Sequence, residues 1–302
     1  MQTPSNHVVS SMNPQVTAAG APEPMLIPTK RNLHFDLNGD RIADWYGGNR
    51  HLSHFLNTLS IFFPEGERFF IQSVRQFRQP DMPAELTAAV NAFIAQESLH
   101  GREHDAYNKL FFDYFPQARE NEQIVTRSLR RMQRRRSASA QLAATMALEH
   151  LTAIMADAVL TDARLTDTME PNYRALWQWH ALEETEHKAV AFDVWVHTHG
   201  KTLKNYLQRC FGLVTATTIF CAFVTPFFLQ ALRSDGVITD GKGWLVFARH
   251  MVGEIGFLRK LVLPWLAYLR PGFHPWRHNN RSQLTRLDAI AAMYAREKGA
   301  TA

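Results

Sequence analysis

The sequence predicts an all-α protein in which a four-helix bundle is followed by an apolar helical hairpin. Long segments in the middle of the 302-residue chain repeat apolar residues at helical spacing. No segment rich in Val, Ile and Thr alternates polar and apolar residues, so no β-sheet is expected. After the predicted bundle, 23 residues carry no charge, which sets the last third of the chain apart.

Prolines and glycines divide the middle of the chain into these helical segments. Pro83, followed by Glu85, predicts the start of a long helix. Pro64 either kinks a helix or lies in the first turn of a new one. Gly200 is expected to end the last helix of the bundle. The expected helices cover residues 51–63, 65–77, 84–114, 117–136, 138–160 and 173–198.

We divide the chain into a disordered tail, a helical bundle and a C-terminal extension, at residues 1–35, 36–200 and 201–302. The tail is rich in Ser, Pro, Ala and Thr and has no apolar core of the signal-peptide type. Cys210 and Cys221 lie on one predicted helix about 16 Å apart, which is too far for a disulfide. We therefore expect a cytoplasmic protein.

The motif Glu-x-x-His occurs twice, on two separate predicted helices. Residues three apart share one face of a helix. A dinuclear metal site in a four-helix bundle takes this motif from two helices and one glutamate from each of the other two. Suitable lone glutamates precede each motif in the chain. The predicted metal ligands are Glu67, Glu97, His100, Glu149, Glu184 and His187.

Two of these ligand positions have a competitor. Glu65 competes with Glu67, which we favour because it lies further into its helix, just before an apolar run. Glu183 competes with Glu184 because it lies four residues before His187, one helical turn away. We favour Glu184 because its spacing repeats that of the first motif.

His104 and His180 lie on the same helix faces as the predicted ligands, and we treat both as catalytic candidates. Each is a third histidine ligand, a partner that orients a ligand, a proton donor, or simply a hydrogen-bonded core histidine. If no metal binds, the glutamates are solvated surface charges. Apolar neighbours such as Phe93 and Trp179 argue against that alternative, because a buried carboxylate needs a partner.

The motifs together resemble a known family. They are NTLS at 57–60, FPEGERFF at 63–70, QESLHGREH at 96–104, ALEH at 147–150, WHALEETEHKA at 179–189 and PGFHPW at 271–276. This set is similar to that of a bacterial family described as predicted metal-dependent hydrolases. The resemblance implies a ferritin-like, metal-binding helical protein, whereas the ligand set is closer to that of oxygen-activating di-iron proteins.

The ligand set predicts an enzyme with two metal ions, iron in the first place, with manganese or zinc as alternatives. Our leading expectation is O2-dependent oxidation of a small apolar or lipid-like substrate. The alternative is a hydrolase that activates water at the same two metals. A second alternative is iron storage or peroxide scavenging.

Partner expectations follow from charge and from motifs that the chain lacks. A net charge of +5 is too mild to indicate nucleic-acid binding. No Gly-x-Gly-x-x-Gly fingerprint is present, so the reductant of such an oxidase comes either from an electron-donor protein or from the substrate. A homodimer is a further expectation that nothing in the sequence decides.

The uncharged run from Cys210 to Leu232 is long enough to cross a bilayer. It either spans a membrane, inserts into one leaflet, or covers the bundle as a buried helix. We favour a hairpin that packs on the bundle or lies at the inner membrane surface. The six arginines between Arg127 and Arg136 are either a solvated segment or a contact with anionic lipid headgroups.

Overall fold

The computed structural model describes residues 25–294. Within these residues the chain is helical, and only an isolated bridge between Tyr46 and Met169 resembles strand pairing. The prediction of an all-α fold is therefore confirmed. The helices are α1 Arg50–Ser60, α2 Phe63–Arg75, α3 Ala84–Tyr114, α4 Ala118–Arg135, α5 Ala138–Thr161, α6 Pro171–His187, α7 Val190–His199, α8 Leu203–Ser234, α9 Gly241–Met251, α10 Phe257–Tyr268 and α11 Arg286–Tyr294. Short 3-10 turns lie at Gly39–Arg41, Ala163–Leu165, Pro275–Arg277 and Arg281–Thr285.

Local sequence signals explain where several helices begin. The Asn49 side chain accepts a hydrogen bond from the Leu52 amide and caps α1. Pro64 lies in the first turn of α2, where its missing N–H costs nothing, so it starts a new helix. Ser137 caps α5 in the same way as Asn49 caps α1.

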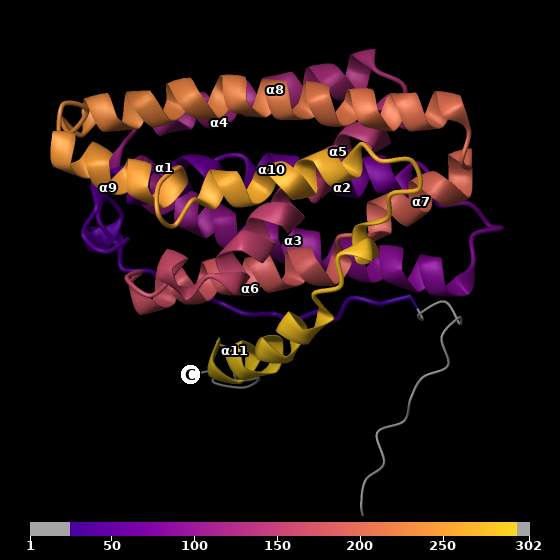
Figure 1. Ribbon diagram of the computed structural model, residues 1–302, viewed down its shortest axis with the longest axis horizontal. Coiled ribbons are helices and arrows are strands. Elements are labelled where there is room, and N and C mark those ends of the chain that lie inside the picture. Colours follow the sequence, from indigo (N-terminus) through magenta and orange to yellow (C-terminus); the bar gives the residue numbers. More distant parts are fainter. Residues whose placement is uncertain (1–24, 295–302) are drawn as a thin grey trace, which may run out of the picture.

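Four helices form the bundle, and each packs on two of the others. α2 packs on α3 and α5, and α6 packs on the same two helices. The helices α8 and α10 lie outside this bundle, against α5 (Figure 1). α8 and the pair α9–α10 run along the bundle as a helical hairpin.

The prediction of a single helix over residues 173–198 is wrong in one respect. The helix is interrupted at Lys188 and Ala189, between α6 and α7. The sequence has no proline or glycine there. Tertiary contacts accompany the break: the Lys188 ammonium donates to the His278 carbonyl and to Asn280 Oδ1, and it lies over the Trp276 ring. A distant segment of the chain thus holds the residue that follows the last predicted ligand.

The apolar stretch after residue 243 is also divided in two. Gly256 adopts a left-handed conformation (φ 66°) between α9 and α10, which glycine allows without steric cost. Pro226 lies inside α8 without ending it. α8 is one continuous helix of 32 residues.

Part of the predicted tail belongs to the folded protein. Residues 1–24 lie outside the described residues, but residues 25–35 run along the bundle. Leu33 is buried, and the Thr29 amide donates to Glu186 Oε2 on α6. The tail prediction is therefore wrong for residues 25–35, because composition does not reveal polar contacts with residues some 150 positions away.

Candidate metal centre

Four helices bring the six predicted ligands to one buried centre. α2 supplies Glu67, α5 supplies Glu149, and α3 and α6 each supply one Glu-x-x-His pair. Donor atoms within 4.8 Å of one another form two groups, Glu67 with His100 and His180, and Glu97 with Glu184 and His187. Glu149 lies beside the second group, with its Oε2 3.5 Å from His187 Nε2.

Glu184 belongs to the second group but also reaches the first. Its Oε1 is 3.0 Å from His180 Nε2, 3.6 Å from His187 Nε2 and 3.8 Å from His100 Nδ1. Thr152 donates its hydroxyl to the other carboxylate oxygen. Glu184 therefore contacts histidines of both groups and would be a ligand shared by them if metal binds.

Glu97, which shares α3 with His100, lies near the histidines of both motifs. Its Oε1 is 3.1 Å from His187 Nε2 and 3.9 Å from His100 Nδ1. The 3.1 Å contact lacks hydrogen-bond geometry, so neither atom is satisfied by the other. Glu97, like Glu184, therefore lies close to histidines of both groups.

The donor atoms of the centre fit a divalent metal. Among the described residues, both carboxylate oxygens of Glu67, Glu97 and Glu149, here called the orphaned glutamates, are buried without a hydrogen-bond partner. His100 Nδ1 and His187 Nε2 are likewise buried without a hydrogen-bond partner. Buried polar atoms without partners are costly, and metal ions bound here supply the partner.

The electrostatics of the centre support this conclusion. Burial raises the pKa of each orphaned glutamate well above its usual range, and neighbouring carboxylates raise it further. Burial also lowers the pKa of His100 and favours the neutral form that binds metals.

Both motif histidines are oriented by a partner behind them. His100 Nε2 donates to Glu183 Oε2 at 3.1 Å, and His187 Nδ1 donates to Gln96 Oε1 at 3.0 Å. The second nitrogen of each ring is thereby left unprotonated toward the carboxylates of the centre. Such carboxylate or amide partners of ligating histidines set both tautomer and orientation.

The two competing glutamates lie outside the donor groups. Glu65 is at the surface, where its Oε1 accepts a hydrogen bond from Arg68 at 2.7 Å. Glu183 belongs to neither donor group and contacts His100 Nε2 and Arg31. The geometry thus favours Glu67 and Glu184 as ligands and gives Glu183 an orienting role.

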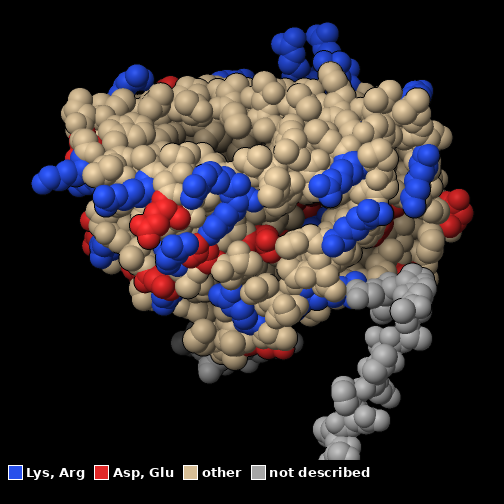
Figure 2. Space-filling model, in the orientation of Figure 1, with Lys and Arg blue, Asp and Glu red and all other residues tan. Residues whose placement is uncertain are grey.

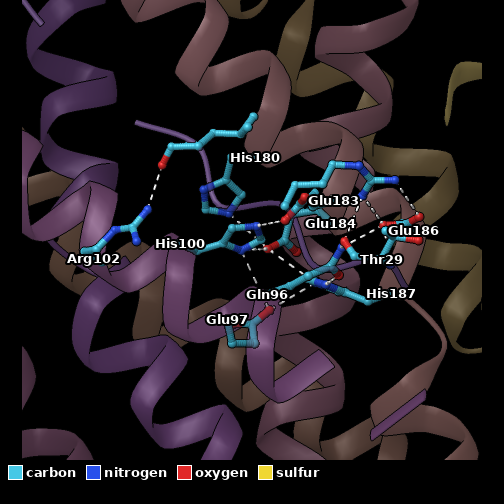
Figure 3. A network of polar contacts seen from close by, with 12 residues as sticks. Thr29, Gln96, Glu97, His100, Arg102, His180, Glu183, Glu184, Glu186 and His187 are labelled. Carbon is cyan, nitrogen blue, oxygen red and sulfur yellow. Dashed lines mark hydrogen bonds and ion pairs between the residues drawn. The ribbon is translucent and has the colours of Figure 1, made fainter. Parts of the chain in front are cut away.

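Arg31 is a residue of the centre that the sequence reasoning missed. Its guanidinium donates to Glu183 at 3.3 Å and to Glu186 at 2.8 Å, and Glu186 in turn accepts from Gln96 at 2.7 Å (Figure 3). Arg31 therefore neutralises the carboxylate layer behind both motif histidines. No local motif signals this role, because the partners of Arg31 lie about 150 positions away in the chain.

His180 and His104 form a chain of hydrogen bonds that ends at the centre. The Ser60 hydroxyl donates to Asn108, so it accepts from His104 Nδ1 at 2.8 Å. His104 Nε2 then accepts from His180 Nδ1 at 2.6 Å. This order leaves the lone pair of His180 Nε2 facing Glu184, 3.0 Å away. His180 is thus positioned as a third histidine ligand, and His104 as the residue that fixes its tautomer.

Comparison with known proteins gives one match. No curated protein and no solved structure matches the chain. The ferritin-like likeness therefore remains a prediction. One family model matches residues 29–279, which cover most of the chain and all the residues of the centre. The chain belongs to the family described as predicted metal-dependent hydrolases.

Proposed function

We propose that this protein is a hydrolase that works with two divalent metal ions in the centre between α2, α3, α5 and α6. The observation that carries the proposal is the set of orphaned glutamates beside His100 Nδ1 and His187 Nε2, which likewise have no hydrogen-bond partner. Family membership supports hydrolysis and gives no support to the oxidation expected from the ligand set alone. The proposed ligands are Glu67, Glu97, His100, Glu149, His180, Glu184 and His187.

Bound divalent ions lower the pKa of a water molecule and polarise the bond that the water attacks. The residues of the chain hold and orient this chemistry. Glu184 and Glu97 lie close to histidines of both donor groups and would hold the ions close together. Gln96 and Glu183 hold the imidazoles of the two motifs in position.

The substrate class is suggested by a cavity of about 230 Å³ between α5, α10 and residues 270–280. The residues that follow two proposed ligands, His150 and Lys188, line it. Its other walls combine apolar residues with Asp157, His278 and Asn280, while Arg270 and Arg277 add positive charge. A substrate with an apolar body and an anionic group, such as a lipid-like ester, matches these walls in polarity and charge.

Oxidation is the second candidate, because carboxylates and imidazoles from four helices are the ligand set of di-iron proteins. In that case iron is required, together with a reductant from an electron-donor protein or from the substrate. Storage or peroxide scavenging is the third candidate and predicts metal uptake beyond two ions per chain.

The deciding experiment loads the metal-free protein with Fe(II), Mn(II) or Zn(II) without air and counts bound ions. The protein loaded with each metal is then assayed, with and without oxygen, on aryl esters of increasing acyl length and on aryl phosphoesters. We expect two ions per chain and hydrolysis that does not need oxygen.

The matched variants are Glu149→Ala, inside the centre, and Glu65→Ala, at the surface of α2. Glu149→Ala should lose metal and hydrolysis, whereas Glu65→Ala should retain both. Turnover that requires oxygen would contradict hydrolysis and support oxidation instead. A protein that binds no metal in any form would remove all three candidates.

A further inference from the structure

The outward stripe of α8 carries no charge over most of its length. Phe211 is 72% exposed, Val214 46% and Ile219 51%. The neighbouring exposed positions are Thr218, Cys221, Ala222 and Thr225. A surface helix of a soluble protein normally has charged and polar residues on this side. α8 instead buries one apolar stripe and exposes another.

The return helix α10 continues this surface. Leu263 is 76% exposed, Val262 53% and Leu266 47%. The two helices are joined directly, because Trp265 Nε1 donates to Thr217 Oγ1 at 2.9 Å. We call the exposed apolar residues of α8 and α10 the apolar face. Figure 2 shows a broad region without charged side chains where these helices lie, with Lys and Arg along its borders.

The apolar face does not belong to a helix that is free to cross a membrane. α5 and α8 are both long and apolar enough to span by length and composition, but α5 is the core helix. α8 is fastened to the fold along its length. Leu213 is buried against α5, and Arg209 donates to the carbonyls of Tyr268 and Arg270. The geometry thus favours contact along the helix axis rather than insertion end-on.

Positive charge lies at the border of the apolar face. α4 packs beside α8, and Asn121 Nδ2 donates to Gln230 Oε1 at 3.0 Å. The six exposed arginines of 127–136 make no ion pair within the described part of the chain. The sequence has no acidic residue between positions 123 and 148. This border therefore presents uncompensated positive charge.

We infer that the apolar face docks in the plane of an anionic bilayer, with the arginines of 127–136 among the lipid headgroups. Apolar burial and headgroup attraction then act on adjoining surfaces. A second copy of the chain is a poorer partner, because a two-fold interface brings the same surface of each copy together. Two basic borders would then approach each other without acidic residues between them.

The test uses the full-length protein and flotation with vesicles of phosphatidylcholine, with or without phosphatidylglycerol. We expect binding to the anionic vesicles that is at least about tenfold stronger than to neutral ones and weakens at high salt. The double variant Phe211→Asp, Leu263→Asp should abolish binding, and Arg130→Glu with Arg131→Glu should remove the preference for anionic lipid. Met293→Asp, at an equally exposed apolar residue of α11, is the matched control and should bind as wild type.

Light scattering and circular dichroism of each variant show that it is folded and give its oligomeric state. A dimer that the Phe211→Asp, Leu263→Asp variant dissociates, without vesicle binding by the wild type, would overturn the inference in favour of a second copy. Binding that resists both high salt and alkaline extraction would overturn it in favour of a spanning helix. Metal content is irrelevant to either result, so the inference stands or falls independently of the proposed hydrolase.

Discussion

The bundle and the C-terminal extension distribute polarity in opposite ways. In the bundle, Glu97 and His100 are fully buried, whereas in the extension Leu263 and Phe211 are more than 70% exposed. The helices α5 and α8 are both long and apolar enough to cross a bilayer. Yet 67% of the most apolar segment of α5 is buried in the protein, against only 22% of the corresponding segment of α8. Helix composition alone therefore does not distinguish a core helix from a surface helix. Each region departs from the usual pattern of apolar residues inside and polar residues outside at the place where we propose a ligand. The proposed ligand is a pair of metal ions in the bundle and a lipid surface in the extension.

The largest effect is expected at Glu184, the carboxylate that we propose the metal ions share. Glu184→Ala removes the group that reaches histidines of both donor groups. Hydrolysis should fall to the uncatalysed rate, and bound metal, measured by atomic emission, should fall below one ion per chain. Glu65→Ala serves as control. Retention of two ions and full activity by Glu184→Ala would contradict the assignment of the centre.

The two faces of α8 should respond differently to the same substitution. Leu213→Asp places a charge against α5 and should lower the free energy of unfolding by about 3–5 kcal/mol. Phe211→Asp, two residues earlier on the outward stripe, should change it by about 0.5 kcal/mol or less. Chemical denaturation of both variants measures the difference. Equal losses would show that the outward stripe is also packed.

The layer behind the histidines should have an intermediate effect. Arg31→Met leaves Glu183 and Glu186 without their cation and weakens the support of His100 and His187. Metal affinity should fall by about 10–100-fold, as is usual when partners of ligating histidines are lost. Competition with a chelator measures it. Arg68→Met, which breaks a surface ion pair, is the control and should leave the affinity unchanged.

The smallest effect is expected on stability, and its sign should differ between the metal-free and the metal-bound protein. Glu67→Met removes an orphaned glutamate whose pKa is raised by burial. The metal-free protein should become more stable by about 1–3 kcal/mol, because an unsatisfied buried group is gone. The stabilisation by added metal should decrease at the same time. Thermal unfolding with and without Zn(II) tests both signs, and destabilisation of the metal-free form would contradict this account of the centre.

The sequence by itself determined the helices and the candidate ligands. α3 begins and ends at the predicted residues because Pro83 and Pro116 bound it. The spacing of Glu97 and His100 places both on one helix face, since that spacing is a property of a single helix. Membership of the metal-dependent hydrolase family was likewise recognisable from short motifs. All these features depend on residues close together in the chain.

Only the tertiary structure decided how the helices use these residues. Glu183 and Glu184 are adjacent, and which of them faces the donor groups depends on how α6 packs on α3. Arg31 reaches Glu183 across 152 positions, and Lys188 meets Asn280 across 92. The exposed stripe of α8 is likewise defined only by its packing on α5. The spacing of residues determines which side chains share one face of a helix. Which helix packs on that face depends on contacts between residues far apart in the chain, and the spacing does not reveal these.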